Sequence, residues 1–130
     1  MRFTGSDLPL DEIARARPAQ RRGKYLVLVE IERLARDLRL DILEMTTKAG
    51  SGHASSSWSA TEILVALFFG GVLRYRSDDP DWAERDRFIM SKGHSVESYH
   101  AVLSKRGFFS EEILDSYGDF NSILAGHPTR

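Results

Sequence analysis

The stretch that decides the fold is residues 31–45, which reads IERLARDLRLDILEM. Apolar residues recur there at steps of three and four, the spacing that gathers them on one face of an α-helix. This pattern predicts a helix over residues 25–48, and Gly50 follows where a glycine that ends a helix is expected. Leu40 and Leu43 widen the apolar stripe, so we expect this helix to be buried on more than one side.

Further elements are expected on the C-terminal side of this helix. A capping-box pattern predicts a second helix over residues 59–70, after a loop over residues 50–57. Residues 87–91 have the length and composition of a short buried strand. Helices are predicted over residues 96–107 and from Ser110 onwards. Alternation of helix and strand is typical of an α/β fold with parallel strands and flanking helices, and we expect that fold to be incomplete at the C-terminal end.

Length and composition restrict the class of protein. The chain has 130 residues, enough for about one domain, with 18 basic and 19 acidic residues and no cysteine. Residues 1–24 carry a net charge of +3 by our count and are expected to be a basic, mobile extension of a domain over residues 25–130. The near-zero total charge favours neither nucleic acid nor a membrane as partner. With no signal peptide or spanning segment evident, a cytoplasmic location is expected.

Three of the four histidines follow glycine, and these three are the candidate site residues: His53, His94 and His127. Glycine leaves room for a ligand and permits positive φ, so each pair can place an imidazole at the rim of a pocket. Imidazole can donate to a phosphate or hydroxyl and can exchange a proton near neutral pH. For any one Gly-His pair taken alone, a histidine in a surface turn is the simpler interpretation. His100, at a helical position, is left out of the site.

Other chemistry has less support from the residues. The spacing of the histidines matches no local metal-ligand motif, so none is assigned to a metal. The three serines over residues 55–57 lack the elbow motif of a serine nucleophile and are expected to cap the next helix. No glycine-rich dinucleotide or phosphate loop occurs.

Four motifs over residues 38–128 resemble the beginning of transketolase, above all the N-terminal component of its split, two-polypeptide form. They are Asp41–Met45 running into Lys48–His53, then Asp86–His94, then Leu103–Phe109, and finally Gly126–Pro128. They follow one another in the family's order and at about its spacing. After His53 the family commonly has a Pro- and Gly-rich stretch, whereas this chain has serines.

The resemblance implies part of a thiamine-diphosphate-binding domain in an enzyme that transfers a two-carbon ketol unit from a ketose to an aldose. It implies catalytic roles for His53, near the reacting carbon, and for His127, near the substrate's hydroxyl and carbonyl groups. It implies that His94 borders the cofactor's diphosphate.

The family's remaining parts are expected on other polypeptides. They comprise the segment that holds Mg²⁺ or Ca²⁺ and the domain that binds the cofactor's pyrimidine. The chain is therefore expected to work in a hetero-oligomer and to be inactive alone. Two alternatives stay open: a related thiamine-diphosphate synthase with a different acceptor, and a non-catalytic assembly module.

Overall fold

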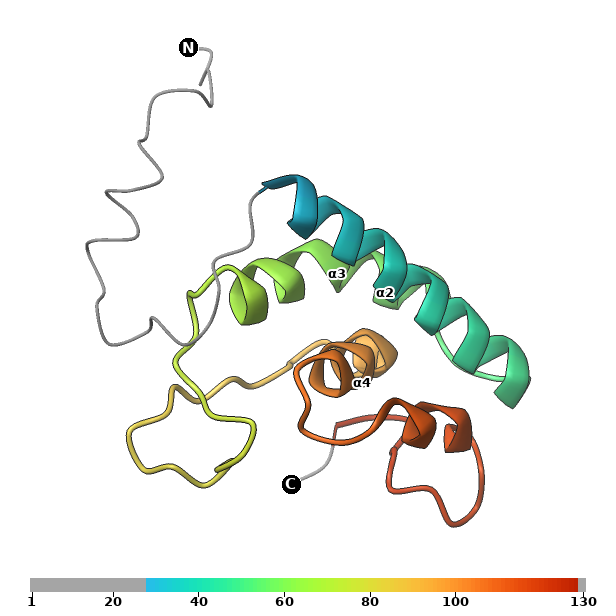
Figure 1. The fold of residues 1–130 in the computed structure, drawn as a ribbon. Helices are drawn as coiled ribbons and strands as arrows, with labels where there is room; N and C mark the ends of the chain where they lie inside the picture. Colours follow the sequence, from blue (N-terminus) through green and yellow to red (C-terminus); the bar gives the residue numbers. More distant parts are fainter. Residues whose placement is uncertain (1–27, 129–130) are drawn as a thin grey trace.

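The computed structural model describes residues 28–128, which are arranged as helices joined by irregular segments (Figure 1). Three α-helices are α2 (Leu28–Ala49), α3 (Ala54–Phe69) and α4 (Val96–Lys105), and two 3-10 helices are η2 (Gly93–Ser95) and η3 (Glu111–Ser116). Figure 1 shows α2 and α3 side by side, with α4 seen nearly end-on beneath them. The predicted end of the first helix is confirmed, because α2 stops at Ala49 and Gly50 has a positive φ of 62°.

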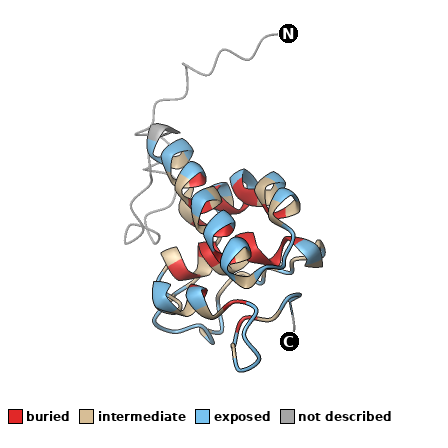
Figure 2. Ribbon diagram, turned by 90° about the vertical axis from the view of Figure 1, so that its right-hand side faces the viewer, coloured by how far each residue is buried: buried red, intermediate tan, exposed pale blue. Residues whose placement is uncertain are grey.

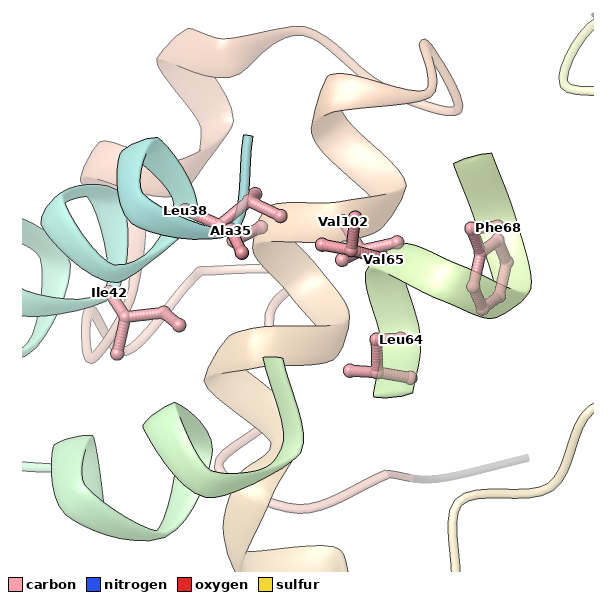
Figure 3. Packing of buried hydrophobic residues seen from close by; sticks show 8 residues of the cluster. Ala35, Leu38, Ile42, Leu64, Val65, Phe68 and Val102 are labelled. Atoms are coloured by element: carbon pink, nitrogen blue, oxygen red, sulfur yellow. The ribbon is translucent and has the colours of Figure 1, made fainter. Parts of the chain in front are cut away.

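The main core lies where the three α-helices meet. In Figure 3, Leu38 and Ile42 of α2 face the interior together with Val65 of α3 and Val102 of α4. Each of these four side chains is fully buried. They lie on the apolar face that the periodicity of residues 31–45 predicts, so burial of apolar surface holds the helices together.

A second cluster joins the C-terminal segment to the end of α2. Met45 of α2 packs there with Leu114, Tyr117 and Leu124. This contact brings residues 111–128 back under the helices, as the red segment in Figure 1 shows. It also brings the last of the four motifs, Gly126–Pro128, close to the loop between α2 and α3.

The predicted start of the second helix is wrong. We expected a loop up to residue 57 and a helix from Ser59, whereas α3 begins at Ala54. The hydroxyl of Ser59 bonds back to the Ser56 carbonyl, as side chains inside a helix do, rather than capping a first turn. The first bond of the helix runs from the N–H of Ser57 to the carbonyl of His53 at 2.9 Å, and the N–H of His53 itself donates to Glu97.

The predicted strand over residues 87–91 is also not found, and no strand is present among residues 28–128. A strand needs a hydrogen-bonded neighbour. Next to this segment, the N–H of Asp86 donates to the Arg74 carbonyl at 2.8 Å, without a ladder of further bonds. Side chains still alternate as in a strand, since Phe88 and Met90 pack on the core while Ile89 is 86% exposed.

The outer side of α2 is more exposed than the sequence predicts. The expectation that α2 is buried on more than one side is wrong in this chain, because Leu40 and Leu43 are exposed. Figure 2 shows exposed residues along the outer side of the helices and buried ones toward the interior. In the described part of the chain, no helix has the length and apolar character needed to cross a membrane. The basic segment 1–24 lies outside the described residues.

The core makes a direct prediction for two leucines of α2. Replacing fully buried Leu38 by Ala should lower the free energy of unfolding by about 2–5 kcal/mol, because it leaves a cavity between the helices. Replacing Leu40, which is 60% exposed, should cost less than about 1 kcal/mol. Urea denaturation followed by circular dichroism measures both. Equal losses for the two variants would contradict the packing described here.

Candidate functional site

A buried carboxylate, that of Glu97 in the first turn of α4, joins four segments of the chain. Its side chain is 0% exposed. Its Oε1 accepts hydrogen bonds from the backbone N–H of His53 at 2.7 Å and from the Tyr117 hydroxyl at 2.9 Å. Its Oε2 accepts a hydrogen bond from the Ser57 hydroxyl at 2.6 Å. The carboxylate therefore fixes the loop before α3, α3 itself and the residue after η3 relative to α4.

These contacts set the charge state of the cluster. Burial raises the pKa of Glu97, but the hydrogen bonds from Ser57, from the His53 backbone and from Tyr117 lower it by more, so this pKa lies below its ordinary value. Burial and the hydrogen bond to Glu97 both raise the pKa of Tyr117. At neutral pH Glu97 is thus the charged acceptor and Tyr117 the neutral donor. Breaking such a buried arrangement on one side is costly, because it leaves a charge without compensation.

Gly52 permits the loop to approach this carboxylate. Its φ is 123°, a conformation that side-chain-bearing residues rarely adopt. A Cβ atom on Gly52 would lie 2.7 Å from Cγ2 of Thr46 and 2.8 Å from Oε1 of Glu97. The glycine of this Gly-His pair is therefore required by the chain's own packing.

The three candidate imidazoles lie together although they are far apart in the sequence. The ring centroid of His53 is 6.0 Å from that of His94 and 5.8 Å from that of His127. All three residues are exposed. The rings come from the loop before α3, from η2 and from the C-terminal segment. The structure thus brings the three predicted residues to one place, and the roles assigned to them stay predictions.

The glycine beside His94 also has a steric reason to be glycine. A Cβ atom on Gly93 would lie 3.1 Å from Cδ2 of His127, tighter than an ordinary contact. Gly126, by contrast, has open space around it. The expectation that each glycine leaves room for a ligand therefore needs revision, since at Gly52 and Gly93 the nearby space is filled by side chains of this chain.

His100, which we left out of the site, lies next to the site and supports it. Its Nε2 lies 2.9 Å from the carbonyl oxygen of Ala125, two residues before His127. Burial lowers the pKa of His100 by more than the hydrogen bond to Ala125 and the charge of Glu97 raise it. A neutral His100 with its proton on Nε2 donates to this carbonyl and so ties the segment bearing His127 to α4.

Sequence reasoning missed Glu97 and Tyr117, which support the site from beneath. Neither belongs to a Gly-His pair. A signal was present for Glu97, because it lies four residues before Ala101 and seven before Ser104, on the face of α4 that is buried. A carboxylate on a buried helical face calls for hydrogen-bond donors. Tyr117 offered no comparable signal.

The arrangement is suited to an oxygen-rich, polar ligand. Exposed imidazoles can donate to phosphate and hydroxyl oxygens and accept protons from them, and the buried carboxylate beneath holds one of them in place. Within residues 28–128, no group of three or more histidine and acidic side chains is placed to hold a metal ion. The three imidazoles therefore form one exposed cluster whose chemistry is suited to binding and proton exchange.

The comparisons with known proteins define the class more narrowly. Residues 30–130 match the family model described as transketolase, thiamine diphosphate binding domain. The chain belongs to the transketolase family, and the resemblance seen in the sequence motifs is confirmed. Its expected α/β fold suits this domain, although the described residues contribute helices without a strand.

Three relatives illustrate the range of the family. One of the subunits of apulose-4-phosphate transketolase from Phocaeicola vulgatus is 44% identical over 91 residues, which are 70% of this chain and 32% of that protein. Human transketolase is 44% identical over 94 residues, 72% of this chain and 15% of that protein. The 6-deoxy-6-sulfo-D-fructose transketolase subunit SqwG of a Clostridium species is 34% identical over 99 residues, 76% and 36% respectively. The chain thus spans about a third or less of the relatives it matches.

The packing around Gly52 predicts the effect of a single methyl group. Gly52→Ala should lower the free energy of unfolding by about 2–4 kcal/mol, since it combines an unfavourable φ with two close contacts. Gly126→Ala, where space is open, is the matched control and should have a small effect. Chemical denaturation of both variants measures the difference. A stable Gly52→Ala variant would show that the loop does not approach Glu97 in this way.

The lowered pKa of Glu97 predicts an acid-sensitive fold. A carboxylate whose folded pKa lies below its unfolded value stabilises the protein above the unfolded value, which is about 4.3 for Glu. This contribution should be lost as the pH falls below about 4.3 toward the folded value. Denaturation at a series of pH values should give a steeper acid loss for the natural chain than for Glu97→Gln. Identical slopes would contradict an ionised, hydrogen-bonded Glu97.

Proposed function

We propose that the chain is one component of a transketolase-type enzyme, which transfers a two-carbon ketol unit from a ketose to an aldose with thiamine diphosphate. The observation that carries the proposal is the meeting of three imidazoles, separated by 41 and 33 residues, with the His53 ring about 6 Å from each of the other two. Because the family is described by its binding of thiamine diphosphate, we take this cofactor as the ligand of the cluster.

The donor set fits parts of that cofactor and its substrates. Neutral or charged imidazoles suit a diphosphate and sugar hydroxyls, both of which are rich in oxygen acceptors. We assign His94 to the diphosphate, and His53 and His127 to the substrate near its reacting atoms. The cofactor, when bound, stabilises the carbanion that ketol transfer requires.

The chain's own residues bind, orient and move protons. His53 and His127 exchange protons with substrate hydroxyl and carbonyl oxygens, where negative charge develops during the reaction. Glu97 and His100 hold the segments that carry them. A divalent cation, Mg²⁺ or Ca²⁺, is proposed to be held by other polypeptide.

We also propose that further polypeptide completes the enzyme in a hetero-oligomer and that the chain alone is inactive. Support comes from two relatives that are named as subunits. The exposed side chain of Ile89 offers such a polypeptide an apolar contact. The location of the assembled enzyme is proposed to be cytoplasmic.

The function is tested by complementation. The 130-residue chain is mixed with the products of neighbouring genes, and ketol transfer between a ketose and an aldose is followed. We expect activity only in the mixture, and a loss of at least about 100-fold in kcat/KM for His53→Ala and for His127→Ala. Arg36→Ala, on the exposed side of α2, is the control and should retain activity.

Two outcomes would contradict the proposal. Activity that requires the chain but tolerates both histidine substitutions would favour an assembly module. Transfer to a different class of acceptor in place of an aldose would favour the related synthase.

A further inference from the structure

The carboxylate of Glu97 also lies close to the side chain of His53. Its Oε1 is 3.7 Å from Nδ1 of the imidazole, besides accepting the hydrogen bond from the backbone N–H of the same residue. The carboxylate is fully buried, whereas the imidazole is 48% exposed. A fixed negative charge therefore faces one particular ring nitrogen of His53.

We infer that Glu97 is a positioning residue that selects the tautomer of His53, with the proton on Nδ1 and the lone pair on Nε2. This inference rests on the proposed function only for its catalytic consequence. The 3.7 Å between Nδ1 and Oε1 is longer than a hydrogen bond, but the negative charge of the ionised carboxylate still attracts an N–H at the nearer ring nitrogen and repels a lone pair there. The hydrogen bonds from Ser57 and Tyr117 keep Glu97 ionised, as its lowered pKa indicates.

Other titratable side chains also lie near His53. The rings of His94 from η2 and of His127 from the C-terminal segment lie beside it, and Tyr117 bonds to the same carboxylate. Tyr117 remains protonated, because its pKa is raised. The ionised Glu97 thus places its charge beside Nδ1.

The tautomer decides what His53 does in the proposed reaction. With Nδ1 protonated, Nε2 is an acceptor, so His53 takes a proton from a substrate hydroxyl instead of donating one first. The proton moves from that oxygen to Nε2, the ring becomes an imidazolium, and the charge of Glu97 offsets the new positive charge. Histidines oriented by a carboxylate act in this way in other enzymes.

The tautomer is measured by long-range ¹H–¹⁵N NMR of the full chain at about pH 8, above the ordinary imidazole pKa. This spectrum separates protonated from unprotonated ring nitrogens. In the natural chain we expect His53 to carry its proton on Nδ1. In Glu97→Gln the ratio of the Nδ1–H to the Nε2–H form should fall about fivefold, because the neutral side chain no longer places a negative charge beside Nδ1.

Ser57→Ala is the matched control. It removes the hydrogen bond to Oε2 and should destabilise the fold. The two donors to Oε1 remain, so at the pH of the measurement Glu97 should stay ionised and the tautomer should not change. An Nε2–H form in the natural chain would overturn the inference. Equal tautomer shifts in Glu97→Gln and Ser57→Ala would show that Glu97 acts only through stability and would also overturn it.

If Glu97→Gln does not fold, Tyr117→Phe serves in its place. This variant removes a competing donor from Oε1 and should keep or strengthen the Nδ1–H form. A shift toward Nε2–H would then overturn the inference. These measurements need neither cofactor nor partner. Failure of ketol transfer in the complementation assay would therefore leave the tautomer result valid, and an unexpected tautomer would leave the result of the complementation assay valid.

Discussion

The arrangement of this chain depends on one buried charge. The carboxylate of Glu97 accepts hydrogen bonds from α3, from the loop that precedes α3 and from the residue that follows η3. A buried carboxylate is stable only when such donors surround it, so these segments take one position relative to α4. Burial of the apolar core of α2, α3 and α4 drives folding. The carboxylate fixes the positions of the segments at the end of the bundle where the histidines lie.

These fixed positions explain how histidines so distant in the sequence form one cluster. His53 is held through its own backbone N–H, and the segment that bears His127 is held by His100 and by the packing of Leu124. The rings themselves stay exposed above this support. The base of the cluster is fixed by these contacts and its surface is open, an arrangement that suits a family described by its binding of thiamine diphosphate.

Local pattern and motif order predicted much of this, and the failures have physical causes. The apolar periodicity of α2 and the glycine after it were sufficient to place that helix, because both act within a few turns. The start of α3 was misplaced because the local pattern pointed to a cap at Ser59, whereas helical bonding already begins at His53. The contacts of His53 and Ser57 with Glu97, which lies 44 residues from His53 in the sequence, are outside any local capping rule. The strand over residues 87–91 was expected from composition, but a strand forms only with a neighbour, and residues 28–128 provide none. The proximity of His53, His94 and His127 followed from the family resemblance, while the residues that hold them required the three-dimensional structure.

The central claim is that the imidazoles of His53, His94 and His127, supported by Glu97, form one wall of a thiamine-diphosphate site completed by other polypeptide. The most direct measurement is a crystal structure of the assembled complex with the cofactor bound. The account predicts all three imidazoles beside the cofactor or the substrate space next to it, with Glu97 buried beneath His53. A cofactor bound away from these rings, or a Glu97 side chain turned to solvent, would contradict it.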